Sequence, residues 1–350
     1  DVSSSNQIHE ERIFKEAEGI RIGVNGVYRL LSSTDLYGQN LTWGFISALG
    51  YNYSYYSLPY QMRDAASFDW QSSTTQQWPE QIWKRSFNTI ANCNNIIQQV
   101  QAKDSSFFEQ GANEKSMILG EMYGIRALLH FDMLRLFSPA PASGNTAVTI
   151  PYVTTYPEYQ PQQLPMTEIF KKITEDMLKA QSLLAPVDTI FLRDVLRNSS
   201  NRVRNNLTPN FQLPAGDFFN FRGERMNFFG ATALLARIYL YMNDYEKAMA
   251  QAQVIYSFKK RNWFQWTNAF FQGMISDVDY IHTKRPNELL LCFSNSKNYD
   301  IWDAATLNNG YSQFYKIRPD YMNALFGSDL DDFRLIGWYN RYNDQRYITW

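Results

Sequence analysis

The sequence contains little cysteine, little histidine and almost no net charge. Its 350 residues include two cysteines and three histidines, and 33 basic residues against 34 acidic ones leave a net charge of −1. Two cysteines as far apart as Cys93 and Cys292 exclude a disulfide-built scaffold, and we expect both thiols to be buried. The balanced charge argues against a general surface for nucleic acid or for anionic membranes.

Long apolar runs and catalytic motifs are also missing. No stretch is long enough for a transmembrane helix, and no secretory signal peptide precedes the polar start at Asp1. His9, His130 and His282 lack the spacing of metal ligands, and the sequence has neither a nucleophile elbow nor a phosphate-binding loop. We therefore predict no catalytic residue, no metal and no cofactor, and we expect His130 to be structural.

Aromatic residues are abundant instead. The chain contains 23 tyrosines, 24 phenylalanines and nine tryptophans, which together make up 16% of it. Most of them will form the core. The flat faces of tyrosine and tryptophan also suit stacking on sugars or lining a peptide groove.

The segment 120–137 predicts a long helix that is apolar on nearly every face. A helix of this kind is buried, and its five charged or histidine side chains make it too polar to cross a membrane. Pro139 ends it. We predict that this is the central helix of an all-α core. Its apolar positions, at three- and four-residue steps, are Met122, Ile125, Leu128, Leu129, Met133, Leu136 and Phe137.

Four further patterns predict helices around this centre. The pattern at 224–258 is a helical hairpin whose small residues Ala236, Ala248 and Ala252 fit the tetratricopeptide repeat. In the pattern at 10–31, glycines occur along the apolar face, and we expect these glycines where two helices pack closely. These glycines are Gly19, Gly23 and Gly26. The four patterns cover residues 10–31, 80–100, 166–186 and 224–258.

Two aromatic-rich segments show no helical period. Residues 40–79 read as a long connection between helices, and residues 259–350 mix loops with a short strand at 287–293. Long ordered loops usually carry function. The alternative is that their aromatic side chains only pin these loops to the core.

These patterns resemble, in the same order along the chain, those of the SusD/RagB family. The resemblance is greatest in the central helix, although Ser138 stands where family members usually have glycine. It continues through the first helix, the second helix and a late Asp-x-Arg segment. The residues that carry it are Gly26, Tyr28, Trp83, Phe87, Asn94, Glu121, Arg126, Ala127, Arg135, Leu136, Phe137, Pro141, Asp332 and Arg334.

The resemblance implies a mainly α, SusD-like fold with tetratricopeptide-type hairpins, long irregular aromatic loops and little β structure. It implies one domain over residues 1–350. A helical-repeat scaffold would cover 10–258 with a loop insertion at about 40–79, and a ligand-side segment would cover 259–350. Family members continue past the Asp-x-Arg segment, so the resemblance also implies that this chain lacks its C-terminal part.

The function implied by the resemblance is nutrient capture without catalysis. Such a protein is a surface-exposed lipoprotein of the outer membrane in Bacteroidetes, anchored by a lipidated N-terminal cysteine that this chain does not contain. It forms a lid on a SusC-like TonB-dependent barrel and delivers oligosaccharide or peptide into it. Glycan and peptide both remain possible ligands from the sequence.

Two other classes of function stay open. One is a tetratricopeptide-type adaptor that binds another protein. The other is an α-helical glycoside hydrolase, which needs two carboxyl groups on either side of a sugar. The residues considered for such a pair are Asp277, Asp279, Asp329, Asp331 and Asp332.

The ligand-binding residues are expected in the two aromatic segments. Stacking on a sugar needs exposed aromatic rings, and its hydroxyls need polar partners close by. We predict that aromatic residues from both segments stack on the ligand and that three polar residues bind its hydroxyls. The aromatic candidates are Tyr53, Trp70, Trp78, Tyr299, Trp302 and Tyr311, and the polar candidates are Asn52, Asp69 and Asn298.

Overall fold

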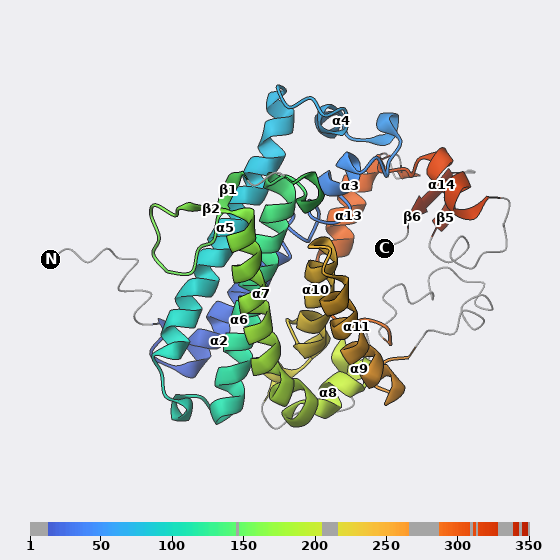
Figure 1. Cartoon of the computed structure of the whole chain (residues 1–350). Helices are drawn as coiled ribbons and strands as arrows, with labels where there is room; N and C mark the ends of the chain where they lie inside the picture. Colours follow the sequence, from blue (N-terminus) through green and yellow to red (C-terminus); the bar gives the residue numbers. More distant parts are fainter. Residues whose placement is uncertain are drawn as a thin grey trace. The chain divides into compact units, whose positions relative to one another are not determined.

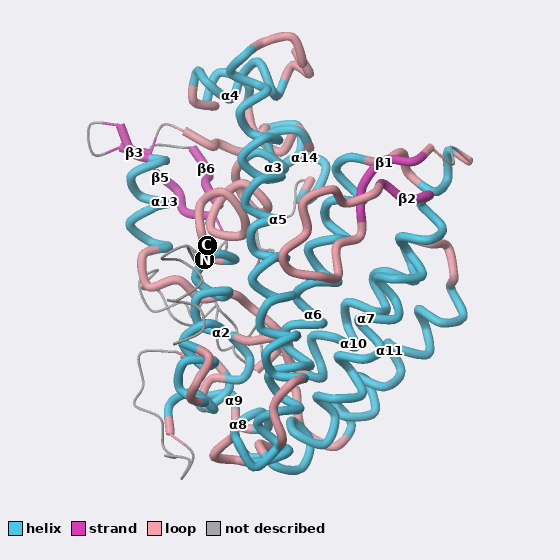
Figure 2. Tube along the Cα trace, turned by 90° about the vertical axis from the view of Figure 1, so that its left-hand side faces the viewer, coloured by secondary structure: helices cyan, strands magenta, loops and turns pink. Residues whose placement is uncertain are grey.

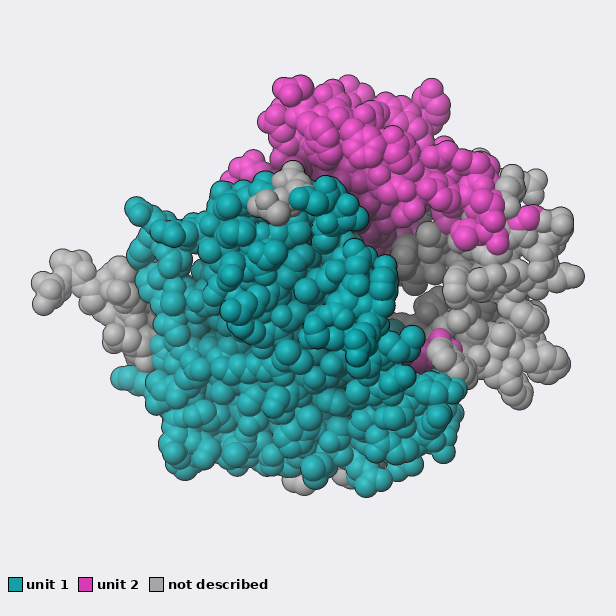
Figure 3. Space-filling view, viewed as in Figure 1, with its two compact units in different colours: residues 1–30, 86–265, 289–293 teal, residues 31–85, 266–288, 294–350 magenta. Residues whose placement is uncertain are grey.

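The computed structural model describes residues 13–144, 147–204, 216–265, 287–308, 311–312, 314–327, 339–342 and 345–348. The described chain is mainly α-helical, as predicted (Figure 1). It divides into two units (Figure 3). Unit 1 comprises residues 1–30, 86–265 and 289–293, and unit 2 comprises residues 31–85, 266–288 and 294–350. The two aromatic-rich segments thus supply most of unit 2.

Unit 1 is a stack of antiparallel helices (Figure 2). Helix α6 (Gly111–Phe137) packs against α7 (Met166–Pro186), and α10 (Phe228–Tyr241) packs against both α7 and α11 (Tyr245–Lys260). The hairpin of α10 and α11 confirms the predicted helical pair. Asp244 caps the N-terminus of α11, where its carboxylate accepts from the backbone N–H of Lys247.

Helix α6 is buried all round, which confirms the predicted central helix. Every residue from Met117 to Leu134 is buried. Two glycines let the neighbouring side chains approach its backbone. A Cβ atom on Gly120 would lie 2.6 Å from Cγ of Leu184, and one on Gly124 would lie 2.6 Å from Cγ of Met226. The absence of side chains at these positions therefore fixes how closely Leu184 of α7 and Met226 pack on α6.

The glycines of the first helix, α2 (Ala17–Leu31), have a different role from the one we predicted. A Cβ atom on Gly23 would make ordinary contacts at 3.5 Å, and one on Gly26 would meet nothing within 4 Å. A Cβ atom on Gly19 would lie 1.6 Å from the backbone oxygen of Ile13, which precedes the turn before the helix. Close packing between helices thus explains none of the three glycines.

The predicted strand at 287–293 is also wrong, since the structure shows irregular backbone there. Individual hydrogen bonds hold this segment in place, and it does not pair in a strand ladder. The backbone N–H of Cys292 donates to the oxygen of Gly223 at 2.8 Å, and Nδ2 of Asn227 donates to the oxygen of Leu290 at 2.9 Å. Cys93 is buried as expected, but Cys292 is only half-buried.

The second predicted helix is longer than expected, and the loop before it is partly helical. Helix α5 runs from Ser73 to Gln101 and contains Pro79, so it begins before the predicted start at residue 80. Within 40–79 the chain also forms α3 (Phe45–Leu49), α4 (Tyr60–Ala66) and a 3-10 turn. Helices of five and seven residues are too short to show a periodic pattern. The prediction of an aperiodic loop was therefore wrong for this segment.

The remaining elements are short. Three two-stranded antiparallel ladders pair β1 with β2, β3 with β4 and β5 with β6. Their bounds are Val148–Pro151, Gln163–Pro165, Leu307–Asn308, Tyr311–Ser312, Tyr339–Tyr342 and Gln345–Ile348. The short helices are α8 (Arg193–Arg197), α9 (Ser199–Arg202), α13 (Asn298–Thr306) and α14 (Pro319–Phe326).

Unit 2 has a core of its own, built from segments far apart in the sequence. The backbone N–H of Ser54 donates to the oxygen of Lys316 at 2.8 Å, next to an antiparallel bridge between Tyr53 and Ile317. The buried members of this core are Trp43, Ala48, Tyr53, Leu58, Met62, Ala66 and Tyr315. Both aromatic-rich segments thus contribute to one cluster, with Tyr315 packed edge-on against Trp43.

Candidate ligand-binding site

Unit 2 carries a row of exposed aromatic rings on its surface. The ring centroids of Tyr51 and Phe68 are 5.4 Å apart, and those of Phe68 and Trp70 are 6.2 Å apart. These three side chains are 46%, 42% and 47% exposed. Arg318 and Tyr321 extend the row, because the guanidinium Cζ lies 5.8 Å from the Tyr51 centroid and 5.3 Å from the Tyr321 centroid. We call these five residues the aromatic track.

Two rings of the track are positioned by helix ends. Tyr51 follows α3 and Phe68 follows α4, and both adopt left-handed backbone, with φ of 56° and 58°. The backbone N–H of Tyr51 bonds to Ala48, and that of the next residue bonds back to Ser47. The same pair of bonds recurs after α4. Both helices therefore end in a Schellman motif with an aromatic residue where glycine is usual.

This placement costs stability. The left-handed conformation of a residue with a side chain costs roughly 1–2 kcal/mol. Residues held in such conformations cluster at functional sites. Tyr51 and Phe68 thus combine a strained backbone conformation with a side chain at the surface.

Arg318 is brought to Tyr51 by the contact between the two segments of unit 2. Its backbone N–H donates to the oxygen of Asn52 at 3.3 Å, which continues the bridge at Tyr53. Its Nε donates to Oδ1 of Asp320 at 3.0 Å. The hydrogen bonds to Asp320 raise the pKa of Arg318 and lower that of Asp320, so both groups are charged.

The predicted polar residues Asn52 and Asp69 directly follow Tyr51 and Phe68, and both are exposed. The backbone N–H of each closes the Schellman motif before it. The carboxylate of Asp69 accepts from the backbone N–H of Gln71 at 3.1 Å. Trp70, also predicted, lies in the track. These three candidates therefore stay in the proposed site.

Three predicted aromatic residues pack into the core of unit 2 instead. Tyr53 is 5% exposed, and its hydroxyl donates to the oxygen of Trp43 at 2.6 Å, while burial raises its pKa well above the usual value. Trp78 and Trp302 pack against the same core and are partly buried. Tyr53 is therefore removed from the proposed contact residues, whereas Trp78 and Trp302, whose rings are only partly buried, remain candidates.

The other candidates lie outside the track. Asn298 and Tyr299 begin α13, and Tyr299 is 72% exposed. Tyr311 lies in β4, and its side chain is outside the described part of the structure. The carboxylates considered for a glycosidase are also outside the described residues: Asp277, Asp279, Asp329, Asp331 and Asp332.

Four track residues were not predicted from the sequence: Tyr51, Phe68, Arg318 and Tyr321. A glycine followed by tyrosine at Gly50-Tyr51 was the available signal, but α3 is too short to identify its end. Arg318 could not be assigned without the pairing of segments more than 250 residues apart. Within the described residues, no group of three or more His, Cys, Asp or Glu side chains could hold a metal ion.

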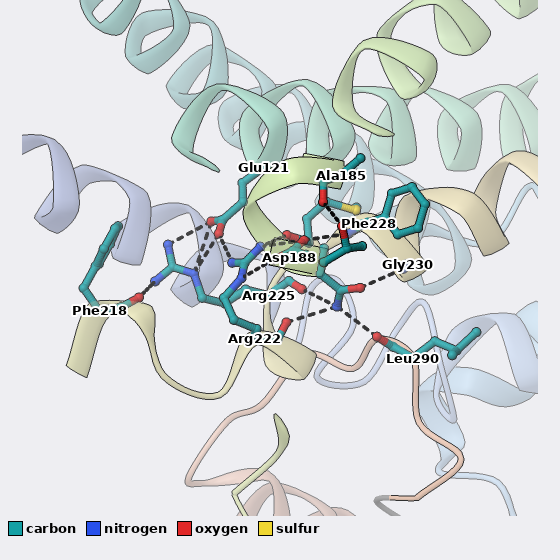
Figure 4. Close-up of polar contacts among 12 residues, drawn as sticks. Glu121, Ala185, Asp188, Phe218, Arg222, Arg225, Phe228, Gly230 and Leu290 are labelled. Carbon is teal, nitrogen blue, oxygen red and sulfur yellow. Dashed lines mark hydrogen bonds and ion pairs between the residues drawn. The ribbon is translucent and has the colours of Figure 1, made fainter. Parts of the chain in front are cut away.

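A second polar cluster lies inside unit 1 (Figure 4). Glu121 on α6 accepts from Nη2 of Arg225 at 2.8 Å and also pairs with Arg222, whose Nε donates to Asp188 at 3.0 Å. Burial alone would raise the pKa of Glu121, but Arg225 and Arg222 hold it below the usual value. Charges buried this deeply need such pairing. The cluster joins α6 to two distant segments and is structural.

His130 is structural as well, as expected. Its Nδ1 lies 2.8 Å from the oxygen of Arg126, and its Nε2 accepts from the backbone N–H of Val153 at 3.0 Å. The ring stacks on Tyr152 with centroids 3.9 Å apart. Burial lowers the pKa of His130 to about 3, so the ring is neutral.

Comparison with known proteins identifies the family. Residues 25–193 match the sequence profile of a SusD-like family described as starch-binding and associating with the outer membrane. Over these residues, just under half of its length, the chain matches the SusD-like family. This confirms the resemblance that its helices suggested. No curated protein matches the sequence.

Solved structures of SusD-like proteins share the fold. One is a Bacteroides vulgatus protein whose description proposes sugar binding, with TM-score 0.67, 18% identity, and coverage of 95% of this chain and 67% of the other. A SusD superfamily protein from the same organism gives TM-score 0.63, 17% identity and coverage of 95% and 68%. A SusD-like carbohydrate-binding protein from that organism gives TM-score 0.60 and 15% identity, with coverage of 91% of this chain and 60% of the other.

The chain of this SusD-like protein spans about two thirds of the length of these structures. The family description places its members with the outer membrane. In the described residues, no helix is long and apolar enough to cross a membrane.

Proposed function

We propose that this SusD-like protein captures an oligosaccharide on the aromatic track and delivers it to a SusC-like TonB-dependent barrel in the outer membrane. The observation that carries the proposal is the continuous row of Tyr51, Phe68 and Trp70, three rings in contact and each more than 40% exposed. Each aromatic contact contributes roughly 1 kcal/mol. Three rings in a row therefore suit a chain of several sugar units.

A sugar ligand fits the track better than a peptide. The rings lie side by side on an exposed surface, with Asn52, Asp69 and Arg318 available beside them for hydroxyl groups. The starch-binding description of the family supports the same choice. If the ligand is a peptide, the proposed transport function stands and only the transported molecule differs.

We propose that binding is not followed by catalysis. Two carboxylates beside the track, in the described part of the chain, already accept hydrogen bonds from the protein. Asp320 pairs with Arg318, and Asp69 accepts from the backbone of Gln71. A glycosidase needs one carboxyl free to protonate the leaving group and another to attack or activate water.

The family description supports a location at the outer membrane, and the partner is proposed from the family resemblance. We propose that the protein is held at the outer surface of the outer membrane by an N-terminal lipid anchor and acts as a lid on the barrel. Avidity on long polymers would compensate for weak binding of each sugar unit.

An adaptor function has one observation in its favour. Helix α11 exposes large apolar side chains on one face, with Tyr245 65%, Met249 60% and Tyr256 52% exposed. Their spacing of four and seven residues places them in one row. A protein partner could bind this row, and the transporter itself is one such partner.

Calorimetry on the purified chain tests the proposed function. The panel contains plant and host oligosaccharides and a mixed peptide digest, and a reducing-sugar assay follows any product. We expect binding to at least one oligosaccharide without product release. Trp70→Ala and Tyr51→Ala should each weaken binding several-fold, whereas the control Tyr159→Ala, an 86% exposed tyrosine of unit 1, should not.

Other results would change the proposal. Product release would show an enzyme. Binding to no oligosaccharide, together with capture of a protein through the face of Tyr245 and Met249, would favour the adaptor. Delivery is tested separately, by asking whether the lipidated protein co-purifies with a TonB-dependent barrel from outer membranes.

A further inference from the structure

The aromatic track contains one charged residue, Arg318, placed between two exposed rings. Its guanidinium lies within 6 Å of the ring centroids of Tyr51 and Tyr321. An arginine in contact with an aromatic face is held flat against the surface that a sugar would occupy. A charged substituent on that sugar would therefore meet the guanidinium directly.

Among the residues that the structure describes, only one edge of this guanidinium is occupied. Nε donates to Oδ1 of Asp320 at 3.0 Å, and Nη2 donates to Oδ2 of the same carboxylate. Nη1 makes no hydrogen bond to any residue in the part of the chain that the structure describes, and the side chain is 35% exposed. The edge formed by Nη1 and Nη2 thus presents parallel N–H groups with the spacing that a carboxylate accepts.

The ion pair with Asp320 does not block this edge. The side chain of Asp320 is 62% exposed, and exposed ion pairs contribute little to stability. The backbone of Arg318 is nevertheless fixed, because its N–H donates to the oxygen of Asn52. By contrast, the buried Arg222 bonds to Glu121, to Asp188 and to the backbone oxygen of Met226. Arg318 is thus both positioned and available to a ligand.

We propose that the aromatic track selects oligosaccharides that carry uronic acids, with Arg318 binding the carboxylate while the neighbouring rings stack on the sugar faces. The inference rests on the proposed function and names the class of its ligand. The planar carboxylate matches the free edge of the guanidinium in shape and in charge.

The test compares each acidic oligosaccharide with its carboxyl-reduced form, which keeps the sugar chain and loses the charge. The probes are oligosaccharides of polygalacturonate, alginate and glucuronoxylan, with binding measured by calorimetry. We expect at least one acidic form to bind about tenfold more tightly than its reduced partner. Added salt should narrow this difference.

Three variants assign the effect to Arg318. Arg318→Gln should abolish the preference for the acid, because the acidic form should lose far more affinity than the reduced form. Asp320→Asn should enlarge the preference, because it removes the competing carboxylate. Lys84→Gln is the control, since Lys84 is a 73% exposed cation of the same unit that pairs with Glu80 and lies outside the track.

The outcomes separate the two proposals. If neutral oligosaccharides bind in a manner that depends on Trp70, and no acid binds more tightly than its reduced form, the uronate preference is wrong and the proposed function stands. A preference that survives Arg318→Gln would also overturn it. If no oligosaccharide binds, acidic or neutral, the proposed function itself fails.

Discussion

Two residues of the aromatic track have backbone conformations that suit glycine better than an aromatic residue. Tyr51 and Phe68 stand at the glycine position of a Schellman motif, each with a positive φ. Their rings reach the surface because the chain reverses at these residues. The strain and the exposure therefore have one origin, and they can be separated experimentally by changing the side chain alone.

Replacing Phe68 should reverse the usual order of alanine and glycine. At a left-handed position glycine avoids the clash of Cβ, so Phe68→Gly should be more stable than Phe68→Ala by about 1 kcal/mol. Both variants should lose ligand affinity equally, because both lack the ring. Urea unfolding measures the stabilities. Leu240, exposed within α10, is the control, since alanine should exceed glycine there by about 1 kcal/mol.

His130 should make stability depend on pH. Burial lowers its pKa to about 3, whereas in the unfolded chain it is about 6.5. The unfolded state therefore takes up the proton first, so the contribution of His130 is complete above about pH 6.5 and is lost as the pH falls toward 3. Between about pH 7 and pH 5 the loss should be about 2 kcal/mol.

The variant His130→Gln provides the comparison for this pH effect. Its stability at neutral pH should be lower, because Gln does not reproduce the stacking on Tyr152. Between about pH 7 and pH 5, the free energy of unfolding of this variant should fall by about 2 kcal/mol less than that of the unchanged protein. Equal slopes in the two proteins would mean that another group controls the effect.

Single residues also mark the limit of the sequence-based prediction. Trp70, Asn52 and Asp69 were predicted because they lie in an aromatic segment, and they lie in the aromatic track or directly follow one of its residues. Tyr53 was assigned to the site by the same reasoning, yet it is buried. An aromatic segment does not reveal which rings face the core when its helices are too short to show a period.

At the scale of elements, the central helix α6 was predictable because its burial is complete. Its apolar residues, and the small residues between them, identify the element wherever it lies in the fold. Its partners were not predictable. Glu121 pairs with Arg222 and Arg225, about 100 residues further along the chain, and nothing in the sequence assigns that pairing.

Two glycine-to-alanine changes should shift stability in opposite directions. Gly120→Ala would place Cβ 2.6 Å from Cγ of the buried Leu184, so we expect a loss of about 1–3 kcal/mol despite the better helix propensity of alanine. Gly26→Ala meets nothing within 4 Å and should gain up to about 1 kcal/mol. Thermal and urea unfolding of both variants measure this. A gain in both would mean that α7 moves away at no cost.

At the scale of the whole molecule, each of the two units is built from segments that are separated in the sequence. Unit 2 takes residues 31–85, 266–288 and 294–350, so its core joins Trp43 to Tyr315. The sequence indicated that both segments are aromatic, and we predicted the ligand-binding residues in them. It could not show that they pack on each other, because pairing between distant segments leaves no periodic signal in either one.

Separate cores predict separate responses to core mutations. Tyr315 is 7% exposed and contacts the rings of Trp43 and Tyr53 at 5.2 Å, so Tyr315→Ala should cost roughly 3–5 kcal/mol within unit 2. Hydrogen exchange should then accelerate in residues 45–66 and remain slow in α6. Ile125→Ala, in the fully buried centre of α6, is the matched variant and should show the reverse. Uniform acceleration across both units would mean that they unfold together. Loss of ligand binding in Tyr315→Ala alone would connect the core of unit 2 to the aromatic track that it supports.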